Sequence, residues 1–172
     1  GYLGTLLKKK GVEWLIKAFK EVDIDATLLI GGKGHEAYER ELRLLASDER
    51  IEFLGHTQPQ TFFQRIDVLV VPSLWQEPLG MVVIEALANH VPVIANRIGG
   101  LQETVIDRVN GLFCDDKMPA SLGNAMKELF YDEDLYNQLS ASARGSVREI
   151  LDRERMISAY EEVMNSVTQP TA

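Results

Sequence analysis

The segment that decides the fold reads DVLVV (67–71), PSLWQEPLG (72–80), MVVIEALA (81–88) and VPVIA (91–95). The first part is almost continuously apolar, which is typical of a parallel strand covered on both faces. Pro78 suits the first turn of a helix, where its missing N–H costs nothing. The segment therefore predicts a strand, a loop, a helix and a further strand, the repeating unit of parallel α/β sheets.

The same alternation extends outward in both directions. Further apolar strands are expected at 1–7, 26–30, 51–54 and 109–114. Apolar residues at helical spacing follow the first three of these strands, and helical spacing continues from Pro119 into a C-terminal helical extension. We therefore expect an α/β, Rossmann-like fold with a parallel sheet of roughly six strands, helices on both faces and right-handed crossovers. The polar tail 168–172 is expected to be loose.

Composition limits the classes of function. The 172 residues suit one domain, so 1–172 is taken as a single Rossmann-like unit. The net charge of −8 argues against a nucleic-acid binder but leaves room for a local basic pocket. Cys114 is the only cysteine, which excludes an intramolecular disulfide and fits a reducing compartment. No run of about 18 apolar residues and no signal peptide occurs, so a cytoplasmic location is expected. Because the chain begins inside a strand, we expect a fragment of a longer protein.

The unusual residues all fall at one edge of the expected sheet. In open α/β sheets, ligands bind beyond the C-terminal ends of the strands. The turns at 8–11, 31–35, 72–80 and 96–101, and His56, all follow strands. We therefore expect them to line a common ligand-binding rim.

Glu85 is the single charge within the apolar helix 81–88. A buried carboxylate is costly unless something hydrogen-bonds it. Its partner could be an Arg or Lys elsewhere in the fold, or a polyhydroxylated ligand lying at the helix N-terminus. The residues alone leave both alternatives open.

Three glycine-rich or basic turns each allow two interpretations. GKGHEA (32–37) matches the dinucleotide-binding pattern G-x-G-x-x-A. That pattern requires an acidic residue at the end of the next strand, but Glu52 lies inside the strand. A plain tight turn is therefore favoured. Lys8–Lys10 is either a solvated charge run or a phosphate clamp beside a helix N-terminus. The loop NRIGGLQE (96–103) is either an ordinary helix start or a place where backbone N–H groups approach an anion.

No sequence pattern indicates a metal site or a catalytic nucleophile. His35, His56 and His90 lack metal-ligand spacing, and no G-x-S-x-G elbow occurs. Cys114 in an apolar strand is interpreted as a core residue, and Asp115-Asp116 as a solvated turn rather than a metal-binding pair.

Seven short motifs in register resemble the C-terminal, nucleotide-sugar-binding domain of GT-B glycosyltransferases, specifically the retaining family 4. The resemblance runs from Gly4 to about Ala143. Its motifs are Gly4-Thr5-Leu6 with Lys10-Gly11, Gly32-Lys33-Gly34, Glu52-Phe53-Leu54-Gly55, Pro72-Ser73 with Glu77 and Glu85 as E-x7-E, Ala88 to Val93, Gly99 to Glu103, and Asn110-Gly111-Leu112.

The resemblance implies roles for the matching residues. Glu77 would contact the hydroxyls of the donor sugar, and Lys10 would neutralise the diphosphate leaving group. Glu85 would accept the ribose hydroxyls, while backbone amides beside Pro78 would hold the sugar and the distal phosphate. The full donor-binding set is Glu85, Pro78, Leu79, Gly80, Met81, Thr5, Lys9, Gly34, Leu54 and His56, of which Gly34 and the 54–56 loop would hold the base.

Two positions depart from the family pattern. Thr5 stands where the family has an Arg, which removes a bidentate phosphate partner, and the neighbouring Lys9 could take that part. His90 stands where the family ends a helix with Gly, and it is expected to adopt the left-handed cap at some cost.

The resemblance implies a metal-independent hexosyltransferase that uses a UDP- or GDP-sugar for glycan, lipid or polysaccharide biosynthesis. No cofactor and no metal are expected. The acceptor would be bound by an N-terminal domain outside this chain, so the isolated domain is expected to be inactive, and the full-length protein could associate peripherally with membranes. The alternatives are a non-catalytic nucleotide-sugar-binding module and a GT-B epimerase; the E-x7-E spacing argues against the epimerase.

Overall fold

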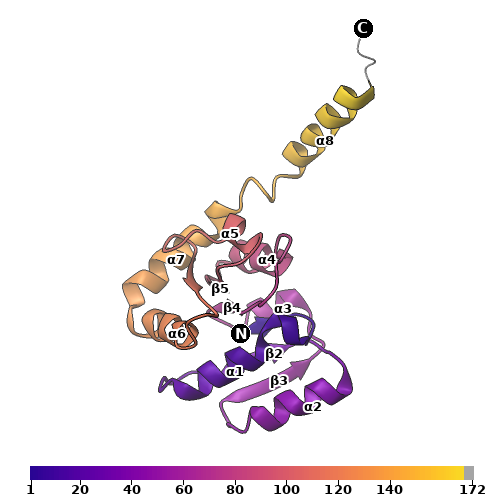
Figure 1. The fold of residues 1–172 in the computed structure, drawn as a ribbon. Coiled ribbons are helices and arrows are strands. Elements are labelled where there is room, and N and C mark those ends of the chain that lie inside the picture. Colours follow the sequence, from indigo (N-terminus) through magenta and orange to yellow (C-terminus); the bar gives the residue numbers. More distant parts are fainter. Residues whose placement is uncertain (169–172) are drawn as a thin grey trace.

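The computed structural model describes residues 1–168 as an α/β domain from which one helix projects (Figure 1). The expectation for the tail beyond Thr168 lies outside the described residues. In chain order the elements are β1 (Tyr2–Leu3), the 3-10 helix η1 (Lys8–Lys10), α1 (Val12–Glu21), β2 (Leu28–Gly31), α2 (Glu36–Leu45), β3 (Ile51–Gly55), α3 (Pro59–Phe63), β4 (Leu69–Val71), α4 (Met81–Ala88), β5 (Val93–Asn96), α5 (Leu101–Thr104), β6 (Gly111–Cys114), α6 (Ser121–Tyr131), α7 (Glu133–Ser146) and α8 (Arg153–Thr168).

All strand pairs are parallel, as expected, but the six strands form two three-stranded sheets instead of one continuous sheet. The strand orders are β1-β2-β3 and β4-β5-β6. The two sheets meet at Gly1, whose N–H donates to the Val68 carbonyl at 2.6 Å and whose carbonyl accepts from Val70 N–H at 2.8 Å. These two bonds are too few for a continuous ladder, because β1 contains only two residues.

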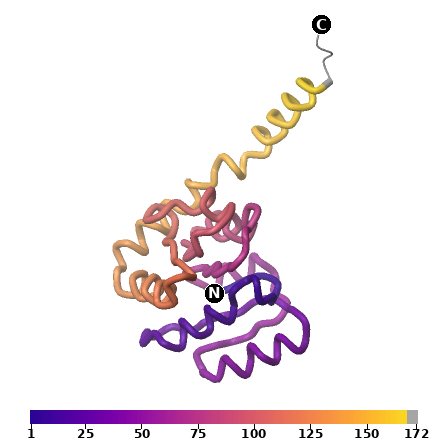
Figure 2. Tube along the Cα trace, in the orientation of Figure 1, coloured from indigo at the N-terminus to yellow at the C-terminus, as the bar shows by residue number. Residues whose placement is uncertain are grey.

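The chain builds outward from β1 to β3 and then crosses back to start again at β4, beside β1 (Figure 2). This reversal makes the gap between the ends of β1 and β4 the topological switch point, where open α/β sheets bind ligands. The first strand is shorter than the expected 1–7. Beyond Leu3 the chain curves over the turn at Gly32, and only Leu6 pairs again, as an isolated bridge to Gly34.

Two apolar cores cover the two faces of the sheets. Val70 of β4 belongs to the core formed with α1, α2, α6 and α7, while its neighbours Leu69 and Val71 belong to the core formed with α3, α4 and α5. This alternation confirms that β4 is covered on both faces. Cys114 is a buried core residue, as expected, and burial raises the pKa of its thiol to about 12.

The turn after α4 adopts the expected left-handed conformation. His90 has a φ of 63°, and its N–H donates to the Leu87 carbonyl at 3.0 Å. Arg108 also has a positive φ, of 58°, in the turn that leads to Gly111. No sequence pattern predicted this second strained position.

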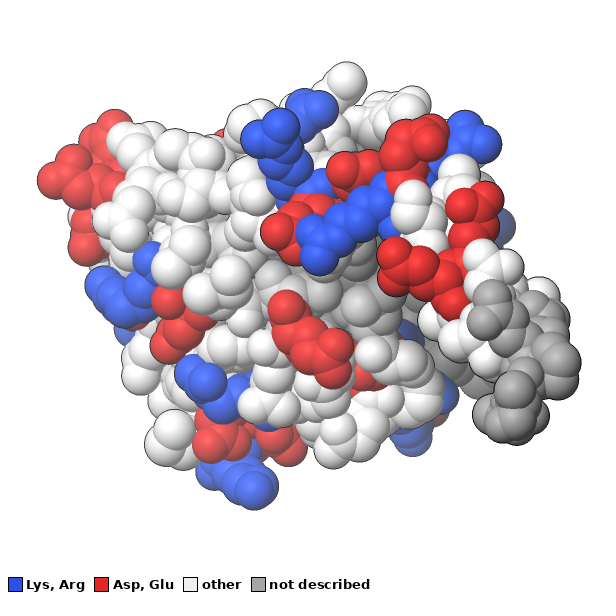
Figure 3. All heavy atoms as spheres, turned by 90° about the horizontal axis from the view of Figure 1, so that it is seen from above, with Lys and Arg blue, Asp and Glu red and all other residues white. Residues whose placement is uncertain are grey.

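The C-terminal helix α8 extends away from the body of the domain (Figures 1 and 2). It carries exposed apolar side chains at positions 156, 160, 163, 164 and 167. None of the helices in the described part of the chain combines the length and apolarity needed to cross a bilayer. Acidic and basic side chains alternate over the face shown in Figure 3, so that face offers no broad basic surface for a nucleic acid.

Candidate functional site

Two loops from distant parts of the sequence lie against each other at the switch point. The loop that follows β1 ends at Gly11, whose φ is 73° and where a Cβ would lie 1.9 Å from the Pro72 carbonyl oxygen. The N–H of Leu74, in the loop that follows β4, donates to the Lys9 carbonyl at 2.8 Å. Close backbone contact, which only glycine permits at position 11, therefore brings η1 beside the loop 72–80.

Glu77 is the centre of this arrangement. Its side chain is buried, with the residue only 7% exposed. Its Oε1 accepts hydrogen bonds from Lys10 Nζ at 2.5 Å and from Ser73 Oγ at 2.7 Å. The structure thus pairs the two residues expected to be catalytic, although they are 67 positions apart.

The surroundings of Glu77 keep its carboxylate ionised. Burial by itself would raise the pKa, but the hydrogen bonds from Lys10 and Ser73 outweigh burial and hold the pKa of Glu77 below its ordinary value of 4.5. The indole N–H of Trp75 also favours the ionised form, although Nε1 makes no hydrogen bond of good geometry in residues 1–168. At neutral pH the site therefore contains a carboxylate and an ammonium in contact.

The loop 96–100 supports the loop that carries Glu77. Gly100 N–H donates to the Glu77 carbonyl at 2.6 Å, and a Cβ at Gly100 would lie 2.1 Å from the Pro78 carbonyl oxygen. Asn96 Nδ2 donates to the Ser73 carbonyl at 2.8 Å. Close packing therefore accounts for the glycine at position 100.

The N-terminus of α4 opens into the same site. The helix begins at Met81, as expected, and its N-cap Gly80 has a left-handed φ of 74°, so Pro78 precedes the helix instead of lying in its first turn. Pro78 lies in the exposed loop. In the described part of the chain, the N–H groups of Leu79, Gly80 and Met81 donate to no protein acceptor. Free amides at a helix N-terminus favour an anion.

Glu85 lies one turn beyond Met81, on the solvent edge of α4, and is half-buried rather than buried. Its side chain makes no ion pair or hydrogen bond within residues 1–168; only its carbonyl accepts, from Asn89 Nδ2. The ion pair with an Arg or Lys is therefore wrong for this residue. An unpaired, half-buried carboxylate beside free helix amides remains available to a ligand.

The remaining donor-binding candidates are spread along the rim. Thr5 and Lys9 are exposed, and the Lys9 ammonium lies 3.6 Å from the centre of the Trp75 ring. Gly34 N–H is already occupied, because it donates to Glu39 Oε1 at 2.6 Å. Leu54 is half-buried and His56 is exposed at the end of β3, next to the G-x-G turn, since Gly32 N–H donates to the Gly55 carbonyl at 2.6 Å.

Two residues at the centre of the site had no predicted role: Ser73 and Trp75. Ser73 was quoted only as part of a Pro-Ser motif. Trp75 had a possible signal, since it is a large aromatic residue two positions before Glu77. Glu52 pairs with Arg65 at 3.6 Å, and both side chains are exposed, which agrees with a plain tight turn at 32–37 rather than a dinucleotide site.

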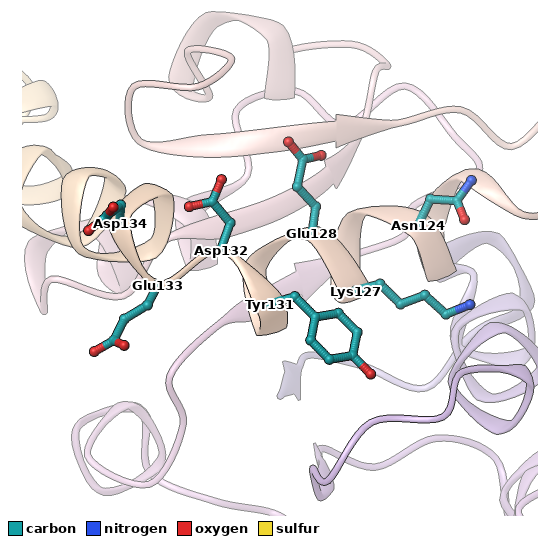
Figure 4. Close-up of a pocket in the computed structure, with 7 residues that line it drawn as sticks. All are labelled: Asn124, Lys127, Glu128, Tyr131, Asp132, Glu133 and Asp134. Carbon is teal, nitrogen blue, oxygen red and sulfur yellow. The ribbon is translucent and has the colours of Figure 1, made fainter.

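No group of three or more His, Cys, Asp or Glu side chains that could hold a metal ion occurs between residues 1 and 168. Asp115 and Asp116 accept hydrogen bonds from Lys117 N–H and Asn96 Nδ2. Figure 4 shows a separate groove along α6 and the start of α7. It is lined by Asn124, Lys127, Glu128, Tyr131, Asp132, Glu133 and Asp134, none of which belongs to the strand-end loops.

Comparisons with solved structures show which fold the chain has. HepE from Anabaena, solved in complex with UDP and glucose, matches with a TM-score of 0.89 at 24% identity, over 96% of this chain and 47% of its own. The C-terminal domain of the group 1 glycosyl transferase LpcC from Francisella tularensis matches with a TM-score of 0.71 at 23% identity, over 86% of this chain and 83% of that domain. The fold is that of the C-terminal domain of GT-B glycosyltransferases.

Sequence comparison then gives the family. The family "Glycosyl transferases group 1" matches residues 1–146, and the chain belongs to it. An uncharacterised glycosyltransferase from Methanocaldococcus jannaschii is 35% identical over 83% of this chain and 41% of its own length. N-acetyl-alpha-D-glucosaminyl L-malate synthase from Bacillus anthracis is 28% identical over 96% of this chain and 45% of its own. The chain thus spans less than half the length of these relatives.

Proposed function

We propose that this chain is the donor-binding domain of a retaining, family 4-type glycosyltransferase that transfers a hexose from a UDP- or GDP-sugar to an acceptor hydroxyl. The observation that carries the proposal is the buried, ionised Glu77, bonded to Lys10 and Ser73 beside the free amides at the start of α4. Family membership supports the transferase class. HepE, which shares the fold, was solved with UDP-glucose, which supports a nucleotide sugar as the ligand.

In this proposal Glu77 binds the sugar and Lys10 binds the diphosphate. Oε1 of Glu77 is occupied by Lys10 and Ser73, while Oε2 has no hydrogen-bond partner in residues 1–168. Oε2 is therefore the oxygen available to a sugar hydroxyl. The amides of Leu79, Gly80 and Met81 hold the sugar and the distal phosphate, and the dipole of α4 adds partial positive charge there.

The nucleoside occupies the other part of the rim. Glu85 accepts hydrogen bonds from the ribose hydroxyls, which explains why its carboxylate has no protein partner. The base lies near Gly34, Leu54 and His56. Because Gly34 N–H is bonded to Glu39, base recognition in this region depends on the other backbone groups.

The transfer breaks the bond between the anomeric carbon and the phosphate oxygen, which keeps the bonding electrons. The acceptor hydroxyl attacks the same face of the sugar, so the configuration is retained, and its proton passes to the departing phosphate. Positive charge from Lys10 and the α4 N-terminus stabilises the leaving group as its charge develops. These groups take the part a metal ion would otherwise play, so we propose metal-independent transfer.

The wider setting of the reaction is also a proposal. Because the chain covers less than half of its relatives, a second, N-terminal domain would bind the acceptor, a glycan or a lipid, and residues 1–172 alone would transfer nothing. The full-length protein would act in the cytoplasm in glycan, lipid or polysaccharide biosynthesis, with peripheral membrane association where the acceptor is a lipid.

Calorimetric titration with UDP, GDP and ADP tests the binding part of the proposal. We expect UDP or GDP to bind and ADP to bind at least about tenfold more weakly. Glu85→Gln should weaken binding of the nucleotide while leaving the melting temperature unchanged. Failure of both UDP and GDP to bind would refute the proposal.

One observation favours a second candidate, a nucleotide-sugar-binding module without transferase activity: Thr5 is exposed where the family has an Arg. Turnover separates the two. In the full-length protein, Glu77→Ala should lower kcat by about a hundredfold or more if the protein is an enzyme. An intact full-length protein that binds UDP or GDP tightly but shows no turnover with any donor would favour the binding module.

A further inference from the structure

We infer that the ring of Trp75 holds the Lys9 ammonium, whose charge no carboxylate balances in the described residues, where it adds net positive charge for the donor's diphosphate. Trp75 is then a positioning residue that acts through Lys9. The inference rests on the proposed function, because it concerns the phosphate part of the same site.

The charge of Lys10 is already balanced within the protein. Its ammonium lies 2.5 Å from the buried Glu77 carboxylate, and both side chains are largely shielded from solvent. A contacting pair of opposite charges attracts a distant anion only as a dipole. Lys10 can therefore orient a phosphate oxygen, but the Lys10–Glu77 pair contributes no net charge.

Lys9 is the neighbouring cation whose charge is not balanced. Its side chain is exposed and forms no ion pair with a carboxylate in the described residues. Its Nζ lies 3.6 Å from the centre of the Trp75 ring, and Lys10 Nζ lies 5.4 Å from the same ring. Lys8 lies instead by Tyr38 of α2, at 5.9 Å. The ring of Trp75 thus lies beside both ammonium groups, that of Lys9 and that of Lys10.

An aromatic ring orients an ammonium group without cancelling its charge. A carboxylate in the place of Trp75 would fix Lys9 equally well, but it would remove the net charge that a diphosphate requires. The backbone beside Trp75 is also bonded to the backbone of Lys9, since Leu74 N–H donates to the Lys9 carbonyl at 2.8 Å. The backbone bond and the ring contact together confine a long side chain that would otherwise move freely.

Separate titrations of the protein with UDP and with uridine, and with GDP and with guanosine, are compared. The difference in affinity within each pair measures what the diphosphate contributes to binding. Lys9→Met keeps the apolar stem and removes the charge; we expect about a tenfold loss of diphosphate affinity, a shallower salt dependence, and no change for the nucleoside. Lys8→Met is the matched control and should change diphosphate affinity by less than about twofold.

Variants of Trp75 test the positioning role. Trp75→Phe keeps a ring for the ammonium and should retain most of the diphosphate affinity, whereas Trp75→Leu should lose about fivefold. Melting curves confirm that each variant is folded. An unchanged affinity in Lys9→Met, or equal losses in Lys9→Met and Lys8→Met, would overturn the inference while leaving the proposed function intact. A wild-type chain that binds neither UDP nor GDP would overturn both.

Discussion

Replacing Lys10 with Met leaves the Glu77 carboxylate buried without its counter-ion, and this should lower stability in a pH-dependent way. In the wild-type structure Glu77 is 7% exposed and Lys10 Nζ lies 2.5 Å from its Oε1. In the variant only Ser73 would still donate to that oxygen. Burial would then dominate, and the pKa of Glu77 should rise above 4.5 instead of lying below it.

The size of the effect follows from the burial of the two partners. Removing one member of a fully buried ion pair costs about 3–5 kcal/mol. The Lys10 side chain is 24% exposed, so water screens part of the interaction. We therefore expect the free energy of unfolding at pH 7 to fall by about 2 kcal/mol.

The sign of the pH dependence follows from the two pKa directions. In the wild type the lowered pKa stabilises the fold above the unfolded pKa, and this contribution is lost as the pH falls through the folded pKa. In the variant the raised pKa of Glu77 lowers the free energy of unfolding at every pH at which this carboxyl is ionised in the unfolded chain. The difference between the two proteins should therefore be largest at neutral pH and should shrink steadily as the pH falls from about 6 to about 3.

Urea unfolding at about pH 7 and about pH 4 measures the difference. The matched control is Lys17→Met, which breaks an exposed ion pair with Glu13 and should cost less than about 0.5 kcal/mol. The double variant Lys10→Met/Glu77→Gln removes both charges and should recover more than half of the loss. A loss in Lys10→Met that is the same at both pH values, or no larger than that of the control, would refute the reasoning.

Three further predictions concern the scaffold. Gly11→Ala should cost on the order of 2–4 kcal/mol in urea unfolding, because a Cβ there would lie 1.9 Å from the Pro72 carbonyl oxygen and φ is 73°; a loss below about 1 kcal/mol would contradict the close contact. Cys114, whose pKa burial raises to about 12, should react with a thiol reagent at about pH 8 at least a hundredfold more slowly in the native chain than in urea; equal rates would show that the thiol is accessible. His90→Gly should stabilise the chain by about 0.5–1 kcal/mol, since φ is 63° and the side chain is exposed; a lower midpoint in urea would mean that the imidazole makes a stabilising contact.

The elements of the fold follow largely from local pattern. The spacing of Val12, Leu15, Ile16 and Phe19 predicted α1, and these four side chains are buried. The uninterrupted apolar residues before Pro72 predicted a strand covered on both faces, which β4 is. His90 was expected in a left-handed cap from its place at the end of a helix, and its φ confirms this. Such features depend on neighbours within a few residues.

Other features needed the relative placement of whole elements. The division into two sheets depends on how β1 and β4 lie beside each other, where the pairing is limited to the two hydrogen bonds that Gly1 makes with Val68 and Val70. The half-burial of Glu85 depends on which side of α4 packs against the sheets. The hydrophobic pattern does not indicate that side, because the helix is apolar on nearly every side. Pro78 was expected in the first turn of a helix, but it lies in the loop before α4, because the left-handed Gly80 is the N-cap.

The sequence by itself determined the order of strands and helices, the edge of the sheet that carries the site, and the identity of Glu77, Lys10 and Glu85 as candidates. Only the tertiary structure decided which of them touch. Lys10 meets Glu77, and Lys9 meets Trp75, because the chain reverses between β1 and β4 and thereby brings two loops together across more than 60 residues. The physical reason is that periodicity reports which face of an element is apolar, whereas a contact across the switch point depends on how separate elements pack.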